Sequence, residues 1–88
     1  MDQRLLKQKA DRLRAELQRA AAASEDARML REQLKDLLDR VDAGKIKEDL
    51  EWEDVPGGMM FLEGSLRHDS ALHDAFAQFQ LLITDMDD

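Results

Sequence analysis

The sequence contains no cysteine, and this absence excludes two classes of structure. Without thiols the chain can form neither a disulfide framework nor a thiolate metal site. A chain without cysteine also suits a reducing compartment. Because the residues after Met1 form an amphipathic stretch rather than the apolar core of a signal peptide, we expect a cytoplasmic protein.

Long apolar runs are absent too, so we expect no membrane-spanning segment and no membrane partner. The composition, 43% hydrophobic and 38% charged, is typical of a helical protein with a thin core and solvated faces. A chain of 88 residues buries only roughly 60–65% of the surface that it exposes when unfolded. Self-association would add stability, and we therefore predict a homodimer.

Basic residues are scarce in the second half of the chain. Residues 1–23 carry six basic and three acidic side chains, and residues 24–47 carry six of each. Residues 48–88 carry eleven acids against a single base, Arg67, so the net charge of −7 arises entirely in this last part. Such polarity predicts how the protein meets its partners but not which chemistry it performs.

Two segments, 2–22 and 25–43, have the apolar spacing of amphipathic helices, and Gly44 follows the second as a C-terminal cap. Steps of three and four residues produce stripes of the coiled-coil type, which we expect to mediate self-association. The stripe residues are Leu6, Ala10, Leu13, Leu17, Leu30, Leu34, Leu37 and Val41.

The junction of these segments allows two arrangements. A single helix over 2–43 would place two consecutive steps of three in the stripe, an irregularity that overwinds a coiled coil. Ser24, followed by Glu25 and Asp26, is a favourable N-cap with acids in the first turn, and it favours an antiparallel hairpin of two helices. Residues 20–23 are all alanine, which favours the continuous helix instead.

Residues 45–64 have a different pattern. Leu50 and Trp52 alternate with acids, and the sequence from Val55 to Gly58 predicts a turn, so we expect an extended segment, which a small β-hairpin would also accommodate. A third helix is predicted over 69–84, capped by Asp69 or Ser70, and a frayed tail over 85–88. The predicted fold is therefore mainly α, in one domain of residues 1–88.

Residues that carry catalytic or metal chemistry are few. His68 and His73 are five positions apart, whereas two ligands on one helix face need a spacing of three or four. Ser24, Ser65 and Ser70 stand where caps or turns need a hydroxyl group. The carboxylates occur in solvated runs without apolar surroundings that would shift a pKa. We expect no enzyme activity, no metal and no cofactor.

The basic N-terminal segment suggests contact with nucleic acid, but three features argue against it. Asp11 and Glu16 interrupt the cations, no aromatic side chain is available to stack on bases, and the chain as a whole is acidic. We therefore expect no nucleic-acid partner.

The favoured function is a protein-binding module, such as a small acidic inhibitor of the immunity or antitoxin type, which masks a basic partner surface. The alternative is a self-assembling coiled-coil subunit, or an adaptor or chaperone, in which the basic segment of one chain docks on the acidic half of another. A continuous helix over 2–43 would favour assembly, and a hairpin would leave the acidic face for an outside partner. Trp52 is the predicted anchor among the partner-binding residues, which are Asp49, Glu51, Trp52, Glu53 and Asp54.

Overall fold

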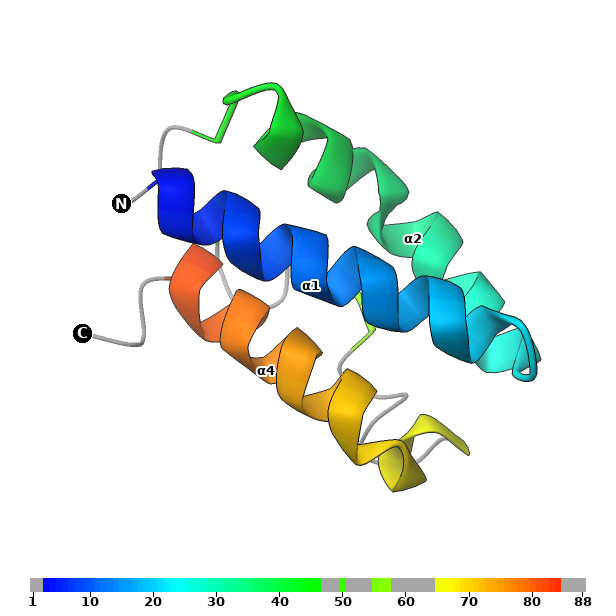
Figure 1. Cartoon of the computed structure of the whole chain (residues 1–88). Coiled ribbons are helices and arrows are strands. Elements are labelled where there is room, and N and C mark those ends of the chain that lie inside the picture. The colour runs from blue at the N-terminus through cyan, green and yellow to red at the C-terminus, as the bar shows by residue number, and fades with distance from the viewer. Residues whose placement is uncertain (1–2, 47–49, 51–54, 58–64, 85–88) are drawn as a thin grey trace.

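The computed structural model describes residues 3–46, 50, 55–57 and 65–84. Within these ranges four helical elements follow one another: α1 (Gln3–Ala21), α2 (Glu25–Asp42), the short 3-10 helix η2 (Ser65–His68) and α4 (Ser70–Ile83) (Figure 1). The mainly α class is confirmed, and the described ranges contain no strand. The possible β-hairpin within 45–64 falls largely outside these ranges and stays a prediction.

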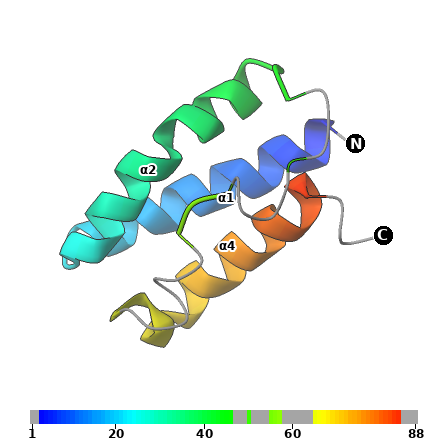
Figure 2. The ribbon, with the colours of Figure 1, turned by 180° about the vertical axis from the view of Figure 1, so that it is seen from behind.

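α1 and α2 are two separate helices joined by a tight turn. The N–H of Ser24 donates to the carbonyl of Ala20 at 2.9 Å, and its hydroxyl accepts from the N–H of Ala27 at 3.2 Å. Glu25 and Asp26 occupy the first turn, where the helix dipole favours negative charge. α2 then returns alongside α1 in the opposite direction (Figures 1 and 2). The predicted hairpin is confirmed, and the continuous helix over 2–43 is wrong.

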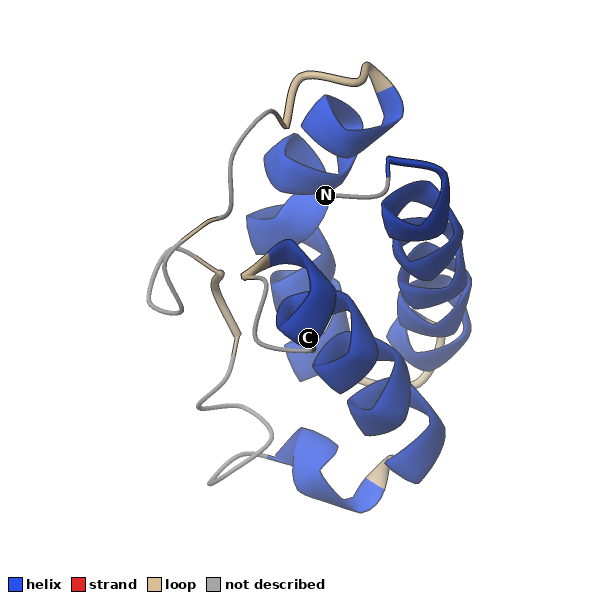
Figure 3. Ribbon diagram, turned by 90° about the vertical axis from the view of Figure 1, so that its left-hand side faces the viewer, coloured by secondary structure: helices blue, strands red, loops and turns tan. Residues whose placement is uncertain are grey.

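α1 is the central element, because both α2 and α4 pack against it. Residues 55–57 lie on the side of α2 and α4 that faces away from α1 (Figure 3), whereas Ile46 lies beside the start of α1, where its carbonyl accepts from Gln3. We call residues 45–64 the connector, since they join α2 to η2. The described residues 55–57 of the connector thus belong to the face of the molecule opposite α1.

The core draws on the apolar faces of all three long helices. Phe76 and Phe79 of α4 are buried, and Trp52 and Phe61 lie outside the described residues. Burying a phenylalanine side chain, as at Phe76 and Phe79, stabilises the fold by about 1.5–3 kcal/mol. The largest fully buried side chains are Phe79, Leu6, Leu13, Leu17, Leu30, Leu34, Leu38, Leu72 and Ile83.

The other helix ends also follow the sequence signals. Gly44 has a φ of 69°, the left-handed conformation expected just beyond a helix, and its N–H donates to the carbonyl of Val41. Asp69, rather than Ser70, caps α4 and accepts from the N–H of Leu72 at 3.1 Å. The predicted frayed tail, residues 85–88, lies outside the described residues. Among the helices described here, none is both long and apolar enough to cross a bilayer.

Candidate partner-binding surface

Charge divides unevenly between the helices and the rest of the chain. The described residues carry twelve basic and ten acidic side chains, a net of +2. The other residues carry ten acids and one base, a net of −9, so they account for all of the surplus negative charge. The predicted partner-binding residues belong to this second group and lie outside the described part of the structure: Asp49, Glu51, Trp52, Glu53 and Asp54.

A polar seam joins α1 to α4. Arg12 Nη2 lies 2.9 Å from Asp74 Oδ2, and Lys9 Nζ donates to Gln78 Oε1 at 2.6 Å. The hydrogen bond from Arg12, together with one from Gln78, holds the pKa of the Asp74 carboxyl below its ordinary value. These side chains are partly to largely exposed, so solvent screening keeps the contribution of the ion pair to stability small.

A second seam joins α1 to α2. Arg14 forms ion pairs with both Asp39 and Asp42, and Lys7 Nζ lies 3.8 Å from Asp42. At least four of the six basic side chains in residues 1–23 therefore pair with carboxylates of their own chain. They are Lys7, Arg12, Arg14 and Arg19. The basic segment is therefore largely neutralised within one molecule.

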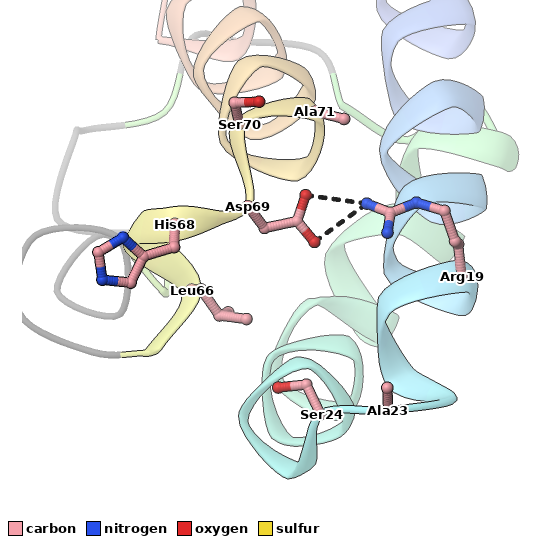
Figure 4. A pocket seen from close by; sticks show the side chains of 8 residues that line it. All are labelled: Arg19, Ala23, Ser24, Leu66, His68, Asp69, Ser70 and Ala71. Carbon is pink, nitrogen blue, oxygen red and sulfur yellow. Dashed lines mark hydrogen bonds and ion pairs between the residues drawn. The ribbon is translucent and has the colours of Figure 1, made fainter.

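An open hollow of about 610 Å³ lies where the α1–α2 turn meets the start of α4 (Figure 4). Arg19 Nη2 donates to both carboxylate oxygens of Asp69, at 2.9 and 3.0 Å, and also to Glu16. These bonds raise the pKa of the guanidinium further above neutrality. His68 is directed away from this pair (Figure 4). An anionic ligand would need a free cation in this hollow, but Asp69 and Glu16 already neutralise Arg19. Ser24 and Asp69 are themselves engaged as helix caps.

The connector is fastened to the helices at several described residues. Ile46 is buried, and its carbonyl accepts from Gln3 Nε2 at 2.6 Å. Leu50 donates its N–H to the carbonyl of Ile83 at 3.0 Å, and Val55 is buried. Residues 51–54 are therefore bounded on both sides by residues that contact the helical body.

Gly57 fastens the connector to α2. Its φ of 106° is the positive value that the predicted Pro56–Gly57 turn requires, so the turn is confirmed. A methyl group at this position would lie within 3 Å of Leu30 Cδ1, and Leu30 has no exposed surface. The backbone at Gly57 thus lies directly against α2.

The predicted self-association stripes lie inside one chain. Their side chains are only 0–6% exposed, so the stripes present no open apolar seam to a second copy. The homodimer stays a prediction, and these residues contribute to the core of a single molecule. They are Leu6, Ala10, Leu13, Leu17, Leu30, Leu34, Leu37 and Val41.

Sequence reasoning overlooked Met29, which is 50% exposed on α2. Its position next to the stripe residue Leu30 is the signal that could have identified it, because adjacent residues of an amphipathic helix point in different directions. Leu5, at 37%, is the other exposed large apolar side chain among the described residues. Single exposed apolar side chains such as these are ordinary on a protein surface and do not by themselves mark a contact.

Within the described ranges, no group of three or more histidine, cysteine, aspartate or glutamate side chains could hold a metal ion. Comparison with known proteins adds no functional assignment: no protein-family model, curated protein or solved structure matches the chain.

Proposed function

We propose that the protein is a non-enzymatic binding module of the small acidic inhibitor type, resembling immunity proteins or antitoxins in its mode of action. Its partner is a protein with a basic surface. The acids of residues 48–54 attract and orient that surface, and Trp52 provides the apolar anchor. The absence of cysteine supports the cytoplasm as the compartment in which they meet.

The uneven division of charge is the observation that carries this proposal. The described residues carry a net charge of only +2, and several of their cations are already paired in the two polar seams, so they offset little of the −9 of the remaining residues. A concentrated surplus of one sign accelerates association with an oppositely charged protein. The net charge therefore supports capture of a basic partner rather than an acidic one.

The fastening of the connector gives further support. Leu50 donates its N–H to the carbonyl of Ile83 and Val55 is buried, so the two residues that flank 51–54 are held by the helical body. Fixing these flanking residues lowers the entropic cost of binding a partner between them.

The hairpin also weakens the alternative of self-assembly. That alternative needed a continuous helix and a free basic segment, whereas the structure has a break after Ala21 and cations paired within the chain. No specific observation favours it over capture of a basic partner.

Two charge-reversal variants test the proposal. In the first, Glu51, Glu53 and Asp54 are changed to Lys; in the second, Asp85, Asp87 and Asp88 are changed to Lys, which alters the net charge equally at another place. Proteins retained from native lysate are compared at low and high salt, and the association rate of the retained partner is then measured. We expect the first variant to lower the association rate and the second to have a much smaller effect. Equal effects would mean that net charge, and not residues 48–54, governs binding.

Trp52→Ala tests the anchor separately. We expect it to increase the dissociation rate, with a loss of about 2 kcal/mol or more in binding free energy. An unchanged dissociation rate would remove Trp52 from the proposed site.

A further inference from the structure

The turn between α1 and α2 is built from residues that favour a helix. Residues 20–23 are all alanine, the best helix former, and neither glycine nor proline marks the reversal. Helical hydrogen bonding continues into the turn, because the N–H groups of Ala23 and Ser24 both donate to the carbonyl of Ala20, at 3.1 and 2.9 Å. Ser24 itself is extended, with a φ of −131° and a ψ of 123°. The hairpin therefore interrupts a helical stretch at Ser24 and has no dedicated turn sequence.

A straight junction would satisfy the same backbone groups. In a continuous helix the N–H groups of residues 25–27 would donate to the carbonyls of residues 21–23. In the hairpin, Ala27 donates instead to the hydroxyl of Ser24 at 3.2 Å. Straightening therefore gives up one N-cap, and the favourable place of two acids in the first turn of α2, in exchange for continuous backbone hydrogen bonds.

The apolar stripes of α1 and α2 would fall on nearly the same face of that helix. Ala20 and Ala27 are both buried and lie seven positions apart, which is close to two helical turns. The second consecutive step of three, from Ala27 to Leu30, overwinds the helix locally but keeps the stripe on one side. A long helix of this kind would present a single stripe from Leu6 to Val41.

In the closed chain a second copy has no access to these stripes, because their side chains are only 0–6% exposed. Exchange of α1 between two copies would remove this obstacle. Both α2 and α4 pack against α1, and the polar contacts of α1 with later parts of the chain would be remade between the copies. Those contacts are Gln3–Ile46, Lys9–Gln78, Arg12–Asp74, Arg14–Asp42 and Arg19–Asp69.

We propose that the chain forms an exchanged dimer with a second copy of itself. Each junction straightens at Ser24, and α1 of one copy takes the place of α1 against α2 and α4 of the other. The buried contacts are those of the closed chain, so the two states differ chiefly at the junction, and a higher protein concentration favours the dimer. This inference does not rest on the proposed function, because the connector keeps its contacts with α2 and α4 in both states.

Proline at position 25 separates the two states. Proline suits the first position of a helix, and the residue before it prefers the extended conformation that Ser24 already has. Glu25→Pro should therefore leave the closed chain folded, with unchanged helical circular dichroism at low protein concentration. In a continuous helix the same change removes a hydrogen bond and clashes with the preceding turn, and it does so in both chains of the dimer.

We expect Glu25→Pro to raise the dimer dissociation constant, measured by sedimentation equilibrium, by more than about 1000-fold. Glu25→Ala is the matched control, since it removes the same carboxylate but should not weaken the dimer. Replacing both Ala22 and Ala23 by glycine opposes the straight junction without proline, and it should also raise the dissociation constant.

Ser24→Ala acts in the opposite direction. It removes the cap that stabilises the hairpin and places a strong helix former at the junction. The dimer dissociation constant should therefore fall roughly tenfold or more.

A distance measurement shows whether α1 is exchanged. Spin labels are placed at Gln8 and Arg40, which are both exposed, and the labelled chain is refolded with an excess of unlabelled chain. In an exchanged dimer the two labels lie about 48 Å apart along one helix, at 1.5 Å per residue. In the closed chain they lie much closer, on packed helices whose axes are about 8–10 Å apart.

Three results would overturn the inference. The first is a Ser24→Ala dimer that gives only the short distance, because closed chains would then associate through another surface. The second is a Ser24→Ala protein that stays monomeric up to millimolar concentration. The third is a Glu25→Pro protein that dimerises as tightly as Glu25→Ala.

Discussion

Two glycine substitutions test whether the connector is fastened to the helices as described. Gly57→Ala introduces a methyl group at a φ of 106° and within 3 Å of Leu30 Cδ1. Gly44→Ala introduces the same group at a φ of 69°, where no atom lies within 4 Å. Both variants have the cost of an unfavourable backbone conformation, but only Gly57→Ala also crowds the core.

The expected losses in unfolding free energy differ clearly. Gly44→Ala should cost about 1 kcal/mol, the usual penalty for alanine at a positive φ. Gly57→Ala should cost about 2–6 kcal/mol, since backbone strain and overpacking each contribute about 1–3 kcal/mol. For a chain of this size, each 1 kcal/mol lowers the Tm by about 4–8 °C. Urea and thermal unfolding followed by circular dichroism measure both variants.

A double variant identifies the cause. Leu30→Ala makes room for the methyl group, so its combination with Gly57→Ala should cost less than the sum of the two single changes. If the connector detaches locally instead, the Leu50 amide should exchange faster with solvent while the helices remain folded. Equal losses for Gly57→Ala and Gly44→Ala, with unchanged exchange at Leu50, would refute the close contact between the connector and α2.

Three further predictions follow from the same structure. The pKa of Asp74 is lower in the folded state than its ordinary value of 3.8. Its pairing with Arg12 therefore stabilises the fold above about pH 4, and this stabilisation is lost as the pH falls through the folded pKa. Carbon-detected NMR titration should show the lowered pKa of Asp74, and Arg12→Gln should raise it. The fluorescence of Trp52, the single tryptophan, should be quenched efficiently by iodide at high ionic strength if this residue is an exposed anchor; blue-shifted emission that resists iodide would assign it to the core. Sedimentation equilibrium at micromolar concentration should give the mass of the predicted homodimer, and a monomer mass throughout would exclude it in that range.

The helices were predictable because their signals are local. The Ser24 cap, the glycine at position 44 and the spacing of apolar residues each act within a few positions, and the structure follows all of them. The heptad stripes were harder to interpret. A stripe indicates that a helix face will be covered, but not whether the cover comes from the same chain or from another.

The pairing of the basic segment could not be predicted from the sequence. Arg12 and Asp74 are 62 positions apart, and they meet only because α4 packs on α1 in one particular register. That register depends on the shapes of the buried side chains, which a charge pattern does not encode.

The hydrogen bond from Leu50 to Ile83 has a thermodynamic consequence for binding. It fastens the connector to the last turn of α4, the helix that completes the core, so detachment of α4 would also release the connector. A partner that recognises only the fastened connector therefore binds the folded state alone. Its binding free energy then adds to that of folding, and the Tm should rise with partner concentration. Conversely, a mutation at the α1–α4 contact, far from any partner, should weaken apparent affinity in proportion to the fraction of molecules in which α4 is detached.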